Sequence, residues 1–136
     1  MASDVPDELR SAVTHRANGR CEYCLIHEHD AGFSHQIDHI VSRKHGGLAT
    51  LENLALACAL QSYKGADVAS IDPQAGQLIR LFNPRQDRWA DHFRVEGGTI
   101  ESLSAIGAVT VRLLRLNAPE RIAERLLLQE LGRYSR

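Results

Sequence analysis

The sequence predicts a small α+β protein, in which short strands are followed by two helices. Residues 34–41 alternate loosely, with the spacing of a strand. Residues 89–95 and 99–103 flank a pair of glycines and predict a hairpin. Residues 104–116 and 118–132 have the composition and the apolar spacing of helices. Strands and helices that occupy separate parts of a chain are typical of the α+β class.

The first expected element is a short helix over residues 7–17. Pro6 and Asp7 stand where a helix start tolerates proline and favours negative charge, and Asn18-Gly19 supplies the stop. The strand over 34–41 is broken by a second pair of glycines, Gly46 and Gly47. A second helix or turn is then expected to begin at residue 50 and to run into the apolar residues that end at Leu60.

Later in the chain, a turn over 72–76 leads into a strand over 77–82. For the last helix, we expect Asn117 as the cap and Pro119 in the first turn. Helical spacing predicts that four apolar side chains of this helix pack inward: Ile122, Leu126, Leu127 and Leu131. The seam near 65–73 divides the chain into an expected core over 1–70 and an extension over 71–136, packed as one unit.

Composition excludes several classes of protein. The 136 residues are 43% hydrophobic and 24% charged, as in average soluble globular proteins, and no apolar stretch is long enough to span a membrane. The N-terminus lacks the basic and apolar segments of a secretory signal, so we expect a cytoplasmic protein with reduced thiols. The net charge of −1 gives no global attraction to nucleic acid, although a local basic face is compatible with it.

Three cysteines form an incomplete metal-binding pattern. Cys21 and Cys24 are two residues apart, and Cys58 follows after a further thirty-three residues. A structural zinc site has four ligands, commonly from two such turns that face each other, but Gln61 stands where the fourth cysteine is expected. The pattern is therefore consistent with a zinc site or with three small buried apolar side chains.

Asp38 and His39 lie between the two halves of the cysteine pattern, at the end of the expected strand. A carboxylate can hold a hard divalent cation, and an imidazole can take a proton from water near neutral pH. The pair therefore indicates a hydrolytic site at this strand end.

Five short motifs in this order resemble the HNH endonuclease family, over roughly residues 16–65. They are Cys21-Glu-Tyr-Cys24, Ile-Asp-His-Ile at 37–40, Arg-Lys-His-Gly-Gly at 43–47, Leu-Glu-Asn-Leu-Ala-Leu-Ala-Cys at 51–58 and Lys64-Gly65. Residues 71–94 also resemble the extension of many stand-alone bacterial members. The resemblance implies a ββα-metal core with one divalent ion between the strands and the helix. Together with the elements predicted above, we expect this core to be followed by a small strand extension and covered by two C-terminal helices.

The resemblance also implies roles for individual residues. His39 would be the general base that activates water against a DNA phosphodiester, and Asp38 would hold the catalytic ion, Mg²⁺ or Mn²⁺. Asn53 would brace the loop and orient His39. Arg43, Lys44 and His45 form a basic cluster that we expect, together with Lys64, to contact DNA; a solvated loop is the alternative for the cluster.

One segment departs from the family pattern, because the stretch between Cys58 and Lys64 is one residue short. Aligned backward from Lys64, Gln61 falls on the Asn or His that helps to bind the catalytic ion. Aligned forward from Cys58, Gln61 replaces the fourth cysteine, and Ser62 replaces that ligand. Either alignment removes a zinc ligand and alters the catalytic site, with Gln61 as the remaining candidate ligand.

Other histidines have simpler expected roles. His27, His29 and His35 could supply the fourth zinc ligand but are expected as solvated loop residues, and His92 is expected to pack at the edge of the core. The function favoured by these residues is metal-dependent hydrolysis of DNA by an HNH endonuclease. The alternatives are a degenerate HNH domain that binds nucleic acid or protein without cutting, and a structural zinc domain.

Overall fold

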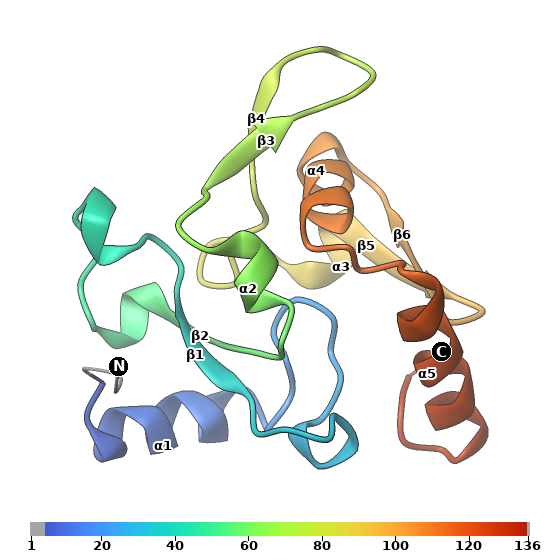
Figure 1. Ribbon diagram of the computed structural model, residues 1–136, viewed down its shortest axis with the longest axis horizontal. Helices are drawn as coiled ribbons and strands as arrows, with labels where there is room; N and C mark the ends of the chain where they lie inside the picture. The colour runs from blue at the N-terminus through green and yellow to red at the C-terminus, as the bar shows by residue number, and fades with distance from the viewer. Residues whose placement is uncertain (1–4, 136) are drawn as a thin grey trace. The chain divides into compact units, whose positions relative to one another are not determined.

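The computed structural model describes residues 5–135, apart from the side chain of Gln61, and the chain forms two compact units (Figure 1). The first unit is Met1–Asp67 and the second is Val68–Arg136. Within the described residues, no helix is long and apolar enough to cross a membrane.

The first unit contains a helix, a two-stranded hairpin and a one-turn helix: α1 (Asp7–Arg16), β1 (Gln36–His39), β2 (Leu54–Ala57) and α2 (Gln61–Lys64). Three 3₁₀ turns, η1 (Glu28–Asp30), η2 (Arg43–His45) and η3 (Leu51–Asn53), lie in its loops. The strands pair antiparallel, with His39 opposite Leu54. The expected first helix and first strand are therefore present, and helix α2 follows the hairpin closely.

All four residues of β2 are buried, and its leucines form a core with Val5 and Val13. Arg16 at the end of α1 donates to the carbonyl oxygens of Leu51 and Leu54, at 2.9 and 2.7 Å, and so ties the helix to the strand. The expectation of a helix or turn over 50–60 was wrong in its second half, because residues 54–57 form a strand. A strand buried on both faces is continuously apolar and lacks the alternation that identifies a strand in sequence.

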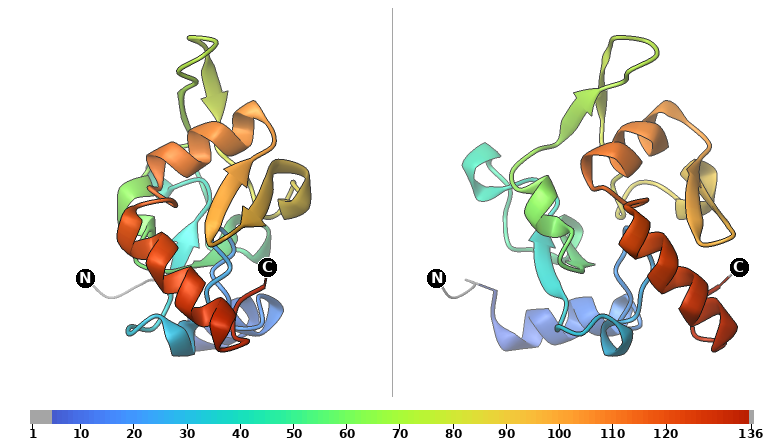
Figure 2. Two further views of the ribbon diagram at one scale, coloured as in Figure 1. Left: turned by 90° about the vertical axis from the view of Figure 1, so that its right-hand side faces the viewer. Right: turned by 45° about the vertical axis from the view of Figure 1, so that its right-hand side comes forward.

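The second unit contains two hairpins and three helices. The hairpins are β3 (Ala69–Ile71) with β4 (Leu78–Arg80), and β5 (Phe93–Glu96) with β6 (Thr99–Ser102), all antiparallel. The helices are α3 (Trp89–His92), α4 (Ala105–Leu113) and α5 (Pro119–Glu130). Helix α4 packs against β6 and against both strands of the first hairpin (Figure 2). The expected hairpin around the glycine pair is confirmed, but residues 89–92 form a helical turn instead of the start of its first strand.

Helix α5 begins at Pro119, one residue later than expected, and its N-cap is Ala118. Asn117 instead accepts from the N–H of Ile100 at 2.9 Å and donates to the carbonyl of Ile100 at 2.8 Å, so its amide pairs with the edge of β6. The expected cap was wrong because an asparagine amide can pair with a strand as well as with a helix end.

The inner face of α5 also differs from the expectation. Leu126, Leu127 and Leu131 are 42, 57 and 62% exposed, whereas Arg125 is buried. The guanidinium of Arg125 donates to the carbonyl oxygens of Gly98 and Leu116 at 2.6 and 2.7 Å. A long cation with satisfied hydrogen bonds can occupy an inner face that apolar spacing assigns to leucine.

Candidate functional site

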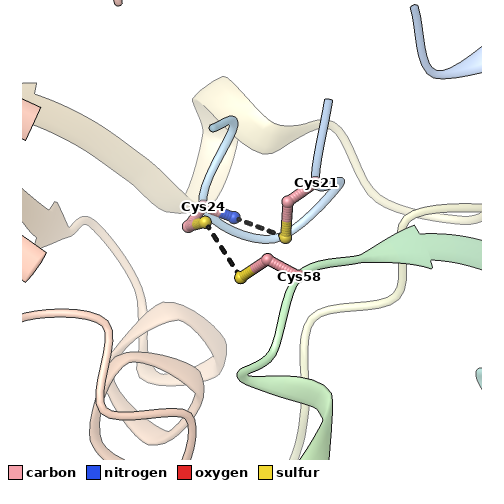
Figure 3. Close-up of side chains that lie close together, drawn as sticks. All are labelled: Cys21, Cys24 and Cys58. Carbon is pink, nitrogen blue, oxygen red and sulfur yellow. Dashed lines mark hydrogen bonds between the residues drawn. The ribbon is translucent and has the colours of Figure 1, made fainter. Parts of the chain in front are cut away.

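The three cysteines meet in one cluster in the first unit. Cys21 and Cys24 lie on a tight turn, in which the N–H of Cys24 points at the sulfur of Cys21 at 3.5 Å (Figure 3). Cys58 follows β2 and brings its sulfur to 3.6 Å from that of Cys24. The three sulfur atoms lie within 4.8 Å of one another, and all three side chains are buried. This spacing allows a single ion to contact all three sulfurs.

Burial favours the protonated form of the Cys21 and Cys24 thiols as long as no cation is bound. It raises the pKa of Cys21 to about 12, and hydrogen bonds with Cys21 and Cys58 raise the pKa of Cys24 well above its ordinary value. A bound metal ion reverses this balance, because thiolates are its ligands and binding releases protons. The cluster therefore fits a thiophilic ion such as Zn²⁺. Among the described His, Cys, Asp and Glu side chains, none adds a fourth ligand atom to it.

The three histidines near the cysteine cluster, His27, His29 and His35, differ in their surroundings. His35 was expected as a solvated residue but is only 5% exposed, and its Nε2 pairs with the carbonyl of Ile26 at 2.9 Å. His27 accepts the N–H of His29 at its Nδ1, and the two rings lie 4.6 Å apart. The expectation for His35 was wrong because the carbonyl of Ile26 gives the buried ring a polar partner.

Asp38 and His39 end β1 and point to opposite sides of it, because successive side chains of a strand alternate. Asp38 is 4% exposed, and its carboxylate accepts from the hydroxyl of Tyr23 at 2.8 Å. Both of its carboxylate oxygens lie 3.3 Å from the ammonium of Lys64. Burial raises the pKa of Asp38, while Lys64 and Tyr23 oppose that rise.

Lys64 lies in α2 and is only 2% exposed. Besides Asp38, its ammonium donates to the carbonyl oxygens of His39 and Ile40, both at 3.0 Å. An ammonium has three hydrogens, and these three acceptors use all of them. Lys64 is therefore not available to a DNA phosphate in this structure, in contrast to the expectation from sequence.

His39 is partly exposed, but its Nε2 atom is buried and has no hydrogen-bond partner within the described part of the chain. A buried polar atom without a partner is costly, so such atoms need an explanation. The hydroxyl of Ser42, three residues further on, is a second buried atom of this kind. Two unsatisfied polar groups thus flank the start of the loop after β1.

Asn53 braces that loop. Its side chain accepts from the N–H of Val41 at 2.9 Å and donates to the carbonyls of Val41 and Leu48 at 2.8 and 3.0 Å. Gly47 is required beside it, because a Cβ there would lie 1.7 Å from the carbonyl oxygen of Val41. The bracing expected of Asn53 is thus visible in its contacts, which go to the loop backbone. Its effect on the orientation of His39 stays a prediction.

The basic cluster that the sequence predicts to contact DNA lies on an exposed turn of the first unit. Arg43, Lys44 and His45 form the exposed turn η2 in the loop that Asn53 braces. In the second unit, Arg80 pairs with Asp87 at 2.7 Å and Arg94 pairs with Glu101. The exposure of η2 is compatible with the phosphate contact expected of this cluster.

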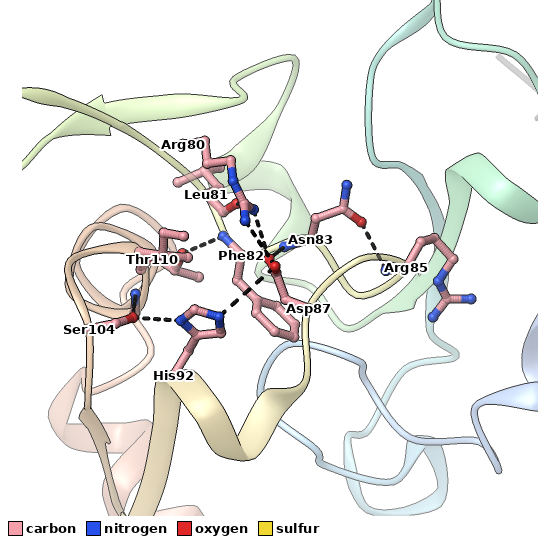
Figure 4. Close-up of polar contacts among 11 residues, drawn as sticks. Arg80, Leu81, Phe82, Asn83, Arg85, Asp87, His92, Ser104 and Thr110 are labelled. Atoms are coloured by element: carbon pink, nitrogen blue, oxygen red, sulfur yellow. Dashed lines mark hydrogen bonds and ion pairs between the residues drawn. The ribbon is translucent and has the colours of Figure 1, made fainter.

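The second unit holds a polar network around Asp87 (Figure 4). Asp87 accepts from Arg80 and from the N–H of Asn83, and the hydrogen bond with Arg80 lowers the pKa of Asp87. His92 pairs with Ser104 at 2.6 Å, and its ring lies 5.9 Å from that of Phe82. These contacts describe a packed residue with a polar partner, as expected for His92.

The described residues do not present an empty site for a hard catalytic ion such as Mg²⁺. The carboxylate of Asp38 already faces a cation, and the hydroxyl of Ser62 donates to the carbonyl of Ala59 at 3.0 Å. The side chain of Gln61, the other expected ligand, lies outside the described residues. A hard ion needs several oxygen ligands, and the described residues do not bring such a set together around Asp38.

Two residues of the site were not singled out from sequence. Tyr23 stands between two cysteines, where an aromatic residue gives no sign of a hydroxyl that reaches a carboxylate. Gly47 belongs to a glycine pair, which indicates a turn but not a close approach of the backbone.

Comparison with known proteins gives one match. Residues 21–60 match the family model described as HNH endonuclease. The match begins at Cys21 and includes β1, the braced loop, β2 and Cys58. Neither the curated proteins nor the solved structures contain a match to this chain. The resemblance found in the sequence motifs is therefore confirmed over residues 21–60, and it indicates a nuclease-type domain.

Proposed function

We propose that the first unit hydrolyses DNA phosphodiester bonds, with His39 as the general base. The supporting observation is His39 itself. It ends β1 inside the matched segment, and its Nε2 atom is buried without a partner in the described residues. A ring nitrogen that the protein leaves unpaired can accept a proton from a water molecule that enters the site.

The neighbouring residues support this role. Asn53 holds the loop after β1, so the exposed turn with Arg43 and Lys44 keeps a fixed place next to the strand end. These cations can position a phosphate close to His39, since phosphate contacts orient nucleic acid without selecting sequence. A divalent ion, Mg²⁺ or Mn²⁺, supplies charge stabilisation of the phosphate in such reactions. No catalytic step is assigned to this ion, because the Asp38 carboxylate already faces the Lys64 ammonium. For the cysteine cluster, we propose Zn²⁺ in a structural role.

Nicking of supercoiled plasmid in the presence of Mg²⁺ or Mn²⁺ tests this proposal. We expect cleavage by the wild type and by His15→Ala, which removes an exposed histidine of α1. We expect His39→Ala to lower the rate by about a hundredfold or more, the usual contribution of a general base. Equal rates for His39→Ala and the wild type would refute the role of His39.

A second function, nucleic-acid binding without cleavage, is favoured by the ion pair between Asp38 and Lys64. In that case the folded wild type leaves the plasmid intact but binds labelled DNA. Replacement of Arg43 and Lys44 by alanine then weakens binding and lowers its dependence on salt concentration. Cleavage that disappears in His39→Ala would rule this function out.

A further inference from the structure

Tyr23, Asp38 and Lys64 form a buried polar group at the carboxylate that was expected to hold the catalytic ion. These side chains are 0, 4 and 2% exposed. One oxygen of Asp38 accepts from the hydroxyl of Tyr23, and the ammonium of Lys64 lies 3.3 Å from both oxygens of this carboxylate. The carboxylate is thus held by two donors from two separate segments of the chain.

Lys64 binds the strand end in the way that a cation binds a cluster of oxygens. Its ammonium meets one carboxylate oxygen of Asp38 and the two carbonyl oxygens of His39 and Ile40. The positive charge balances Asp38, and the three hydrogens are all used. A divalent ion at this carboxylate would have to displace a buried and fully paired ammonium.

The same contacts fix the backbone of His39. The carbonyls of His39 and Ile40 accept from Lys64, and the N–H of Ile40 donates to the carbonyl of Asn53 at 2.9 Å. The peptide that follows His39 is therefore held through both its carbonyl and its N–H. Because the backbone sets the direction of a side chain, the contacts of Lys64 help to fix the position of the His39 imidazole.

We propose that the Lys64 ammonium is the resident cation of the Asp38 site, and that Asp38 and Lys64 are positioning residues for His39. A divalent ion accordingly does not bind Asp38 in the folded wild type. The importance of His39 rests on the proposed function. The occupancy of the Asp38 site is independent of the proposed function, and it can be measured without DNA cleavage.

Lysine-selective isotope labelling of the full chain gives a direct test, because Lys44 and Lys64 are the only lysines. Lys44 is exposed and Lys64 is buried, so Lys44 is the internal control. We expect an ammonium signal of Lys64 that exchanges slowly with water, and a Lys44 signal lost to fast exchange. Millimolar Mn²⁺ should leave the Lys64 signal sharp. Fast exchange at Lys64, or broadening of its signal by Mn²⁺ in the folded protein, would overturn the proposal.

Two variants test the positioning of His39. In Asp38→Asn, which keeps the size of the side chain, we expect faster exchange of the Lys64 ammonium and a shifted ring signal of His39. Lys64→Met should shift the same ring signal, and Lys44→Met should leave it unchanged. Should Lys64→Met fail to fold, the charge-neutral pair Asp38→Asn with Lys64→Met provides the measurement. Ring signals of His39 identical to the wild type in the folded variants would overturn the positioning role.

Plasmid nicking separates this proposal from the proposed function. A wild type that leaves DNA intact but shows a protected Lys64 refutes the nuclease and supports the resident cation. A wild type that nicks DNA with Mn²⁺ while the Lys64 signal stays sharp also supports it, because the ion then binds elsewhere. Nicking together with Mn²⁺ broadening of the Lys64 signal would overturn the resident cation and return Asp38 to the role of metal ligand.

Discussion

Replacing Asn53 with alanine tests how the loop after β1 is held. The wild-type side chain makes three hydrogen bonds to this loop, two with Val41 and one with Leu48. The bond to Leu48 is exposed, so water can replace it, whereas the two with Val41 are partly buried. At about 1 kcal/mol net for each of these two bonds, we expect the loop to open about 2 kcal/mol more easily.

Hydrogen exchange at the amide of Val41 measures this opening, because that N–H donates to the Asn53 side chain. A cost of about 2 kcal/mol corresponds to roughly thirtyfold faster exchange. Glu52→Ala, at an exposed neighbour in the same turn, should leave the rate unchanged. Asn53→Asp should exceed the alanine effect at neutral pH, because its carboxylate would face two carbonyl oxygens. Wild-type exchange at Val41 in folded Asn53→Ala would refute the bracing role.

Three further predictions concern the metal, pH and packing. In competition with a chelator, Cys58→Ser should bind Zn²⁺ more weakly than the wild type. The wild type should bind Zn²⁺ more tightly at pH 8 than at pH 6, because the thiols must lose protons to become ligands. Asp87→Asn should lower the melting temperature at pH 7. Because Arg80 lowers the pKa of Asp87, this difference should begin to shrink below the ordinary carboxyl value of about 3.9 and vanish as the pH falls through the lowered pKa of the folded state. Gly107→Ala places a Cβ 2.3 Å from the carbonyl oxygen of His92 and should cost about 1–3 kcal/mol, measured by unfolding with Trp89 fluorescence.

The sequence predicted those elements that carry a local pattern. Strand β1 and the hairpin of β5 with β6 have alternation or a glycine turn, and α1 has recognisable ends. Strand β2 has only a continuous apolar run, because both its faces are buried, and this gives a helix and a strand the same appearance. Local pattern therefore predicted the partly exposed elements and misassigned the central one.

The sequence predicted which residues belong to the site better than it predicted the contacts among them. The spacing of the cysteines indicated one cluster, and the structure brings their sulfur atoms within 4.8 Å. The burial of Lys64 could not be inferred, because a lysine in sequence indicates an exposed residue. Its acceptors, Asp38 and the carbonyls of His39 and Ile40, lie 24 to 26 positions earlier in the chain. Only the folding of α2 onto the hairpin brings these groups together.

The short segment between Cys58 and Lys64 connects the proposed function with the Lys64 ion pair. Replacing Gln61 with the dipeptide Cys-Asn restores both a fourth cysteine and a polar ligand, and it adds one residue. Each residue turns an α-helix by about 100°, so an addition within α2 turns Lys64 away from Asp38.

We therefore expect this insertion to tighten Zn²⁺ binding, expose the Lys64 ammonium to exchange and raise plasmid nicking by about tenfold or more, the effect of correct placement of a metal ligand. Replacing Gln61 with cysteine alone is the matched control, because it keeps the length of the segment and the Lys64 ion pair. Raised nicking in the insertion variant with Lys64 still protected would contradict this reasoning, since the gain would then not come from the release of Asp38. Release of Lys64 without a gain in nicking would instead show that the shortened segment is not what limits catalysis.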